Sequence, residues 1–108
     1  MQDITVQELQ ERIENGQMPV MVDVREPYEW ELQHLDGIHK ISMGDIPAKM
    51  EEMATNWKEE ELVVICRSGG RSGRITQYLR SQGFQHVRNL TGGMLAWKEE
   101  IDPSFIIE

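Results

Sequence analysis

The sequence predicts an α/β domain with a central, mostly parallel sheet and helices on both faces. Short apolar segments rich in β-branched residues alternate along the chain with segments whose apolar residues recur at helical spacing. The clearest strand is Leu62-Val63-Val64-Ile65, an uninterrupted apolar run typical of strands buried on both faces. About four or five strands alternate with helices, and this order favours βα units joined into a parallel sheet.

The first half of the chain is assigned from caps, turns and apolar spacing. We expect a short strand at Ile4, followed by a helix that begins at the Thr5–Glu8 capping box and ends at Asn15-Gly16. A strand over residues 19–24 and a short helix over 28–33 come next. A short strand over 38–42 then leads to a helix with Pro47 in its first turn. In that last helix, Ile46, Met50 and Met53 are expected to face the core.

The second half is assigned in the same way. After the strand at 62–65 we expect a helix from Arg71 to Gly83, a strand around Val87, and a final helix opened by Thr91-Gly92-Gly93. The residues expected to face inward on these two helices are Ile75, Tyr78, Leu79, Met94, Leu95 and Trp97.

Cys66, the only cysteine, stands where the apolar run 62–65 ends. The following Gly69-Gly70 pair cannot continue a strand cheaply, but it allows a tight turn with positive φ. The order is therefore strand, cysteine, tight loop, helix. In parallel sheets, ligands bind at the carboxyl ends of strands, which is where Cys66 falls.

The loop after Cys66 is expected to lower the pKa of its thiol. A glycine-rich loop that enters a helix directs backbone N–H groups and the positive end of the helix dipole at one spot. Arg67, Arg71 and Arg74 add positive charge, and no acid lies between residues 66 and 74. Such a cysteine is a thiolate nucleophile at neutral pH. The alternative is that Cys66 is one more buried strand residue, as lone cysteines usually are.

Composition and charge limit the domain count and the classes of function. The 108 residues predict one domain, residues 1–108, and the net charge of −8 argues against a general nucleic-acid binder. No apolar run is long enough to span a bilayer and no signal peptide is visible, so we expect a cytoplasmic protein with a free thiol and no membrane partner. His34, His39 and His86 show no metal-ligand spacing with the cysteine, so no metal or cofactor is predicted.

Three segments also resemble the rhodanese family, in the family's order and over nearly the whole chain. Residues 22–26 (V-D-V-R-E), 29–30 (E-W) and 34–38 (H-L-D-G-I) resemble its N-terminal signature. Residues 66–72 (C-R-S-G-G-R-S) resemble its active-site loop, and residues 89–97 (N-L-T-G-G-M-L-A-W) its C-terminal signature. The size resembles the single-domain rhodaneses, which are thiosulfate or persulfide sulfurtransferases. The resemblance implies a five-stranded parallel sheet flanked by helices.

The chain departs from the family pattern at two places. Asp36 stands at a turn position where proline is common, and Gly73-Arg74 replaces small apolar residues in the helix after the loop. We expect Asp36 to have little effect on the site, and Arg74 to add positive charge near its mouth.

If the resemblance holds, Cys66 carries a sulfane sulfur as a persulfide, in two half-reactions with ping-pong kinetics. The donor would be thiosulfate or a persulfide, and the acceptor cyanide or a thiol such as thioredoxin or glutathione. Arg67 would attract the donor, Arg71 would hold the loop closed as well as touch substrate, and Ser72 would cap the helix or contact the thiolate. The residues expected to bind the substrate are Arg67, Ser68, Gly69, Gly70, Arg71 and Ser72.

Two other functions are compatible with a cysteine loop. Cysteine phosphatases and arsenate reductases use a C-x5-R loop, whereas Cys66 and Arg71 form the shorter C-x4-R, and no general-acid aspartate is evident beside the loop. A non-enzymatic binding or sulfur-carrier module is the second alternative. Asp23 is expected to pair with Arg25 or with an arginine of the site, and Trp97 to line the approach to Cys66 or pack in the core.

Overall fold

Four parallel strands form the centre of the computed structural model, which describes residues 3–108. The strands are β1 (Val20–Asp23), β2 (His39–Lys40), β3 (Leu62–Ile65) and β4 (Val87–Asn89), in the order β2-β1-β3-β4. The helices are α1 (Val6–Glu14), α2 (Pro27–Leu32), α3 (Ile46–Trp57), α4 (Gly70–Ser81) and α5 (Gly93–Glu100), with a 3-10 turn η1 (Met43–Asp45) before α3. The predicted α/β class is confirmed.

The expected fifth strand is present only as a single bridge. Ile4 pairs in parallel with Leu90, its N–H donates to the carbonyl of Asn89 at 3.0 Å, and its own carbonyl accepts from Thr91 at 2.9 Å. The chain cannot follow β4 further, because Thr5 caps α1: its hydroxyl accepts from the N–H of Glu8. The structure therefore has four strands and one bridge where five strands were predicted, so the predicted count is wrong by one.

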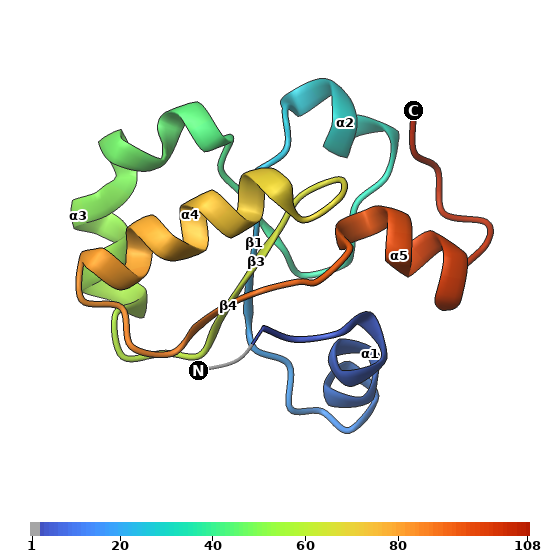
Figure 1. The fold of residues 1–108 in the computed structure, drawn as a ribbon, viewed down its shortest axis with the longest axis horizontal. Helices are drawn as coiled ribbons and strands as arrows, with labels where there is room; N and C mark the ends of the chain where they lie inside the picture. Colours follow the sequence, from blue (N-terminus) through green and yellow to red (C-terminus); the bar gives the residue numbers. More distant parts are fainter. Residues whose placement is uncertain (1–2) are drawn as a thin grey trace.

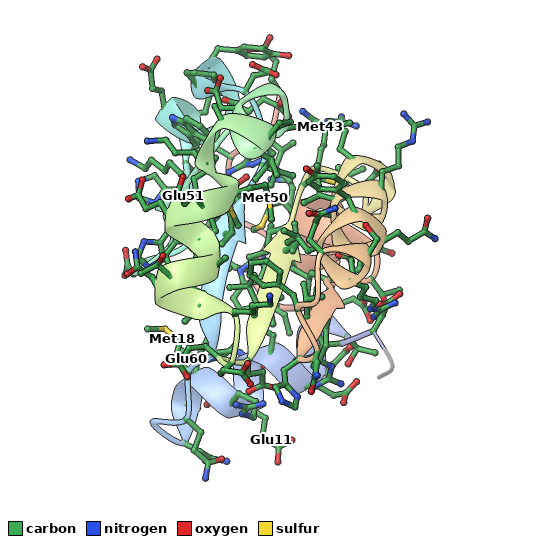
Figure 2. All side chains as sticks on the ribbon, turned by 90° about the vertical axis from the view of Figure 1, so that its left-hand side faces the viewer. Glu11, Met18, Met43, Met50, Glu51 and Glu60 are labelled. Carbon is green, nitrogen blue, oxygen red and sulfur yellow. The ribbon has the colours of Figure 1, made fainter. Side chains whose placement is uncertain are left out.

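The helices cover both faces of the sheet (Figure 1). Side chains of β3 alternate between two cores: Val63 and Ile65 pack on the side of α1 and α5, and Leu62 and Val64 on the side of α3 and α4. Figure 2 looks onto α3 and shows Met50 directed toward the sheet, as predicted, while Glu51 points away from it.

Two inward-facing predictions are wrong. Tyr78 of α4 and Leu95 of α5 are each 37% exposed. On α4 the buried position next to Ile75 is taken by Thr76, whose hydroxyl donates to the carbonyl of Ser72 at 2.7 Å. The other inward predictions on these helices are confirmed, since Ile75, Leu79, Met94 and Trp97 are buried.

A buried ion pair closes the end of β1. Asp23 and Arg25 are each 1% exposed in their side chains, and the guanidinium Nη2 of Arg25 lies 2.8 Å from Oδ2 of Asp23. The same nitrogen donates to the carbonyl of Gln33 at 2.8 Å, which ties the end of β1 to the chain after α2. Asp23 therefore pairs with Arg25, the first of the two expected partners.

No helix within residues 3–108 is long and apolar enough to cross a membrane.

We predict that Arg25→Met lowers the free energy of unfolding by about 3–5 kcal/mol, because it leaves Asp23 buried without a counter-charge. Urea denaturation measures this change. Lys49→Met is the matched control: its pair with Glu52 is exposed, so the change should stay within about 0.5 kcal/mol. Equal losses in the two variants would contradict the assignment of Arg25 as a structural residue.

Candidate active site

Cys66 follows β3 directly and opens a short loop into α4. Gly69 makes the turn with φ of +100°, a backbone conformation that favours glycine, and α4 begins at Gly70. The N–H of Gly73 donates to the carbonyl of Gly69 at 3.0 Å, which joins the loop to the first turn of the helix. The predicted sequence of strand, cysteine, tight loop and helix is observed.

The start of α5 fixes the orientation of this loop. The N–H of Met94 donates to the carbonyl of Cys66, and the N–H of Leu95 donates to the carbonyl of Arg67, both at 2.9 Å. In a trans peptide the C=O of one residue and the N–H of the next point in opposite directions. Two carbonyls directed at α5 therefore turn the N–H groups of Arg67 and Ser68 away from α5.

This contact requires glycine at position 93. Gly93 has φ of +58°, and a Cβ there would lie 2.5 Å from the carbonyl oxygen of Cys66 and 2.7 Å from that of Arg67. Real Cβ atoms essentially never approach backbone so closely. Gly93 therefore permits the approach of α5 to the cysteine loop.

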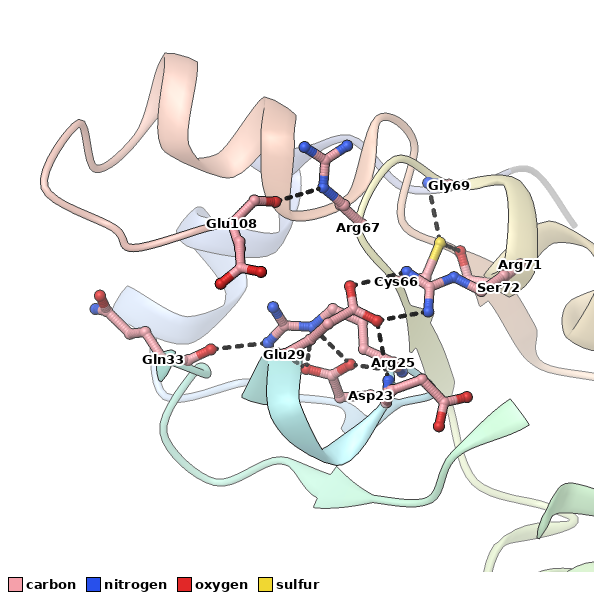
Figure 3. Close-up of polar contacts among 11 residues, drawn as sticks. Asp23, Arg25, Glu29, Gln33, Cys66, Arg67, Gly69, Arg71, Ser72 and Glu108 are labelled. Atoms are coloured by element: carbon pink, nitrogen blue, oxygen red, sulfur yellow. Dashed lines mark hydrogen bonds and ion pairs between the residues drawn. The ribbon is translucent and has the colours of Figure 1, made fainter. Parts of the chain in front are cut away.

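The sulfur of Cys66 receives hydrogen bonds from the loop and from α4 (Figure 3). The N–H of Gly69 donates to Sγ at 3.0 Å, and the hydroxyl of Ser72 lies 3.2 Å from it. Burial raises the pKa of the Cys66 thiol, but the Ser72 hydroxyl and the N–H groups of Ser72, Gly69 and Ser68 outweigh it. The pKa of Cys66 is consequently below its usual value.

The arginines of the loop are placed differently from one another. Arg71 forms a two-point ion pair with Glu29 of α2, with distances of 2.7 Å and 3.0 Å. Hydrogen bonds from Arg71 hold the pKa of the Glu29 carboxyl below its usual value, and Glu29 raises the pKa of Arg71 in turn. Nε of Arg67 donates to the carbonyl of Glu108 at 3.1 Å, and Arg74 is exposed.

The sequence alone assigns no contact or function to two residues of this site. Glu29 lies within the N-terminal signature and Asn89 within the C-terminal one, but spacing along the chain does not show what they contact. Asn89 of β4 accepts a hydrogen bond from Ser72 and donates from Nδ2 to the carbonyl of Gly69 at 3.2 Å. Its place among the signature residues was the one available signal.

The remaining predicted residues divide between loop surface and core. Ser68 of the loop and Gly70 at the start of α4 are exposed, whereas Trp97 packs in the core beside α1. The Asp23–Arg25 pair lies beside α2 (Figure 3), where Arg25 binds Asp23 and the carbonyl of Gln33 rather than the thiol. Within residues 3–108, no group of three or more His, Cys, Asp or Glu side chains is arranged to hold a metal ion.

Comparisons with known proteins agree with this fold. Residues 5–100 match the family described as Rhodanese-like domain. The "Putative sulfurtransferase YtwF" of Bacillus subtilis is 43% identical over 101 residues, which cover 94% of each chain. A rhodanese-like domain protein from Staphylococcus aureus has a TM-score of 0.81 with 29% identity, covering 100% of this chain and 99% of that one. The human single-domain sulfurtransferase TSTD1 has a TM-score of 0.76 with 26% identity, over 91% and 96%.

We predict that Gly93→Ala destabilises the fold by about 2–5 kcal/mol, because positive φ costs about 1–2 kcal/mol and overpacking against the loop backbone about 1–3 kcal/mol. Urea denaturation measures the loss. Gly44→Ala is the control, since a Cβ there meets nothing within 4 Å and φ is not positive. A Gly93→Ala protein as stable as that control would contradict the close approach of α5.

We also predict that Cys66 reacts with iodoacetamide with a pH midpoint below about 8.5, the value of an unperturbed cysteine. Ser72→Ala removes one hydrogen bond to the thiolate, so the midpoint should rise by about 0.5–1 pH unit. Ser81→Ala, at the exposed end of the same helix, should leave the midpoint unchanged. A fall in the midpoint of Ser72→Ala would exclude Ser72 as a donor to the thiolate.

Proposed function

The chain belongs to the rhodanese-like family, and on this premise we propose that it is a sulfurtransferase that carries a sulfane sulfur on Cys66 as a persulfide. Relatives named as sulfurtransferases over nearly the same length support the reaction class. The observation that carries the proposal is the environment of Sγ, where amide and hydroxyl groups stabilise negative charge on sulfur in a buried site.

In the first half-reaction the Cys66 thiolate attacks the outer sulfur of thiosulfate. A new S–S bond forms at Sγ, the bond to the sulfonate group breaks, and sulfite leaves with the electron pair. The negative charge then resides on the outer persulfide sulfur. A persulfide donor would react in the same way, with a thiolate as the leaving group.

In the second half-reaction a nucleophile takes the outer sulfur and returns Cys66 to the thiolate. Cyanide would yield thiocyanate, and glutathione would yield glutathione persulfide. The dithiol of thioredoxin would first take the sulfur as a persulfide, and its second thiol would then form the disulfide and release sulfide. Because donor and acceptor use the same cysteine in turn, the kinetics should be ping-pong. We place this chemistry in the cytoplasm, where a lone cysteine remains a free thiol.

The loop residues would take the roles that their positions allow. The N–H groups of Ser68, Gly69 and Ser72 would stabilise the anionic sulfur, and one such donor is typically worth about 3 kcal/mol of barrier. Gly70 would let the donor approach, because its backbone is exposed at the helix start. Arg67 at the mouth would attract anionic donors.

The position of Arg71 favours sulfur transfer over phosphate-ester hydrolysis. A phosphatase loop needs its arginine to clamp the oxyanion, whereas Arg71 is held at two points by the buried carboxylate of Glu29. Arg71 would therefore brace the loop against α2 rather than bind substrate directly. The C-x4-R loop is also one residue shorter than that of the phosphatases.

We predict that intact-mass measurement after incubation with thiosulfate shows the gain of one sulfur atom, which cyanide or a thiol removes. Cys66→Ser should gain none, because its hydroxyl is not an anion at neutral pH. Thr55→Ser, on the exposed part of α3, is the control that should behave as wild type. Hydrolysis of a generic phosphate ester by wild type without any sulfur gain would support the phosphatase instead.

A further inference from the structure

The hydroxyl of Ser72 has one proton to donate, but two hydrogen-bond acceptors lie within reach of it. Its Oγ lies 3.2 Å from Sγ of Cys66 and 2.5 Å from Oδ1 of Asn89. A serine hydroxyl carries one O–H group and can therefore donate to only one of them at a time. Ser72 is fully buried, so water does not substitute for the acceptor that loses the proton.

The second acceptor is held in a fixed orientation. Nδ2 of Asn89 donates to the carbonyl of Gly69 at 3.2 Å, and a flipped amide would place Oδ1 against that carbonyl oxygen. The backbone N–H of Asn89 donates to Oδ1 of Asp3 at 3.1 Å, which secures the residue at the end of β4. Oδ1 of Asn89 is therefore presented to Ser72 as an acceptor and cannot become a donor.

We propose that Asn89 is a positioning residue that competes with Cys66 for the hydroxyl proton of Ser72. When Cys66 is a thiolate, the hydroxyl donates to Sγ. When Cys66 is a neutral thiol, its S–H donates to Oγ of Ser72, and the hydroxyl donates onward to Asn89. Asn89 thus favours every state in which Sγ carries no negative charge.

Under the proposed function this competition also acts on the persulfide. Formation of the new S–S bond moves the negative charge from Sγ to the outer sulfur, so Sγ becomes a weak acceptor. The hydroxyl of Ser72 then turns to Asn89, and the outer sulfur is left to the backbone N–H groups of the loop. Asn89 would stabilise the persulfide relative to the free thiolate.

The other charged groups near the thiol are not altered by changing Asn89. Arg71 of α4 interacts electrostatically with Cys66 and is paired with Glu29 of α2. Arg67 of the loop is bound to the carbonyl of Glu108. Asp3 accepts a hydrogen bond from the backbone N–H of Asn89, which a side-chain substitution retains. A shift in the titration of Cys66 on mutation of Asn89 is thus not an indirect effect of these ion pairs.

The test is a double-mutant cycle on the pH midpoint of Cys66 alkylation by iodoacetamide. Asn89→Ala should lower the midpoint by about 0.5–1 pH unit, because the Ser72 proton is then available to Sγ alone. In a Ser72→Ala background, Asn89→Ala should cause no shift. Asn56→Ala, on the exposed side of α3, is the matched control and should leave the midpoint unchanged.

A higher midpoint in Asn89→Ala, or the same shift with and without Ser72, would overturn the proposal, because Asn89 would then act through its bond to Gly69. Asn89→Asp provides a second measurement if the alanine variant does not fold. It retains an acceptor and adds negative charge, so its midpoint should rise; a fall would contradict the competition.

The persulfide is tested by equilibrating the protein with thiosulfate and sulfite above the alkylation midpoints and measuring the persulfide fraction by intact mass. Asn89→Ala should lower the persulfide-to-thiolate ratio about 3–10-fold, as one lost hydrogen bond implies. An unchanged ratio would overturn this part. If wild type takes up no sulfur, the proposed function fails, while the alkylation cycle still decides the competition because it uses no sulfur donor.

Discussion

The geometry of the site depends on two hydrogen bonds, from the first turn of α5 to the carbonyls of Cys66 and Arg67. A chain that leaves a buried strand has its C=O and N–H groups pointing to alternate sides. By donating to both carbonyls, α5 leaves the intervening N–H groups available to the other side of the loop. The absence of a side chain at Gly93 makes this contact possible, so a residue distant in sequence decides which backbone groups surround the sulfur.

Around this frame, each neighbouring element stabilises the loop from a different direction. Helix α2 contributes Glu29, which binds Arg71, and strand β4 contributes Asn89, which binds both Ser72 and Gly69. These bonds are made in a partly or fully buried setting, where charge is stabilised by fixed donors rather than by water. The sulfur is consequently held in an environment that tolerates negative charge despite complete burial of Cys66.

The arginines illustrate how formal charge differs from available charge. In the sequence, residues 66–74 combine three arginines with no acid, as if their whole charge were directed at the cysteine. In the fold, Glu29 neutralises Arg71, and Nε of Arg67 donates to the carbonyl of Glu108 in the C-terminal segment. Most of the local stabilisation of the thiolate therefore comes from amide and hydroxyl dipoles, which suit a single sulfur atom better than a multiply charged oxyanion.

Local sequence determined the strand–helix order, the loop after Cys66 and the capped start of α1, because these features depend on apolar spacing, glycine turns and caps between near neighbours. The resemblance of three segments to a known family pointed to the loop residues, but it also implied five strands. The structure has four, because Thr5 caps α1 and the segment at Ile4 makes only one bridge. Spacing also misplaced Tyr78 and Leu95, since burial depends on which helix face meets the sheet. Only the tertiary structure brought Glu29 and Asn89 to the loop, because those contacts join α2, β4 and α4 across residues that are far apart in the chain.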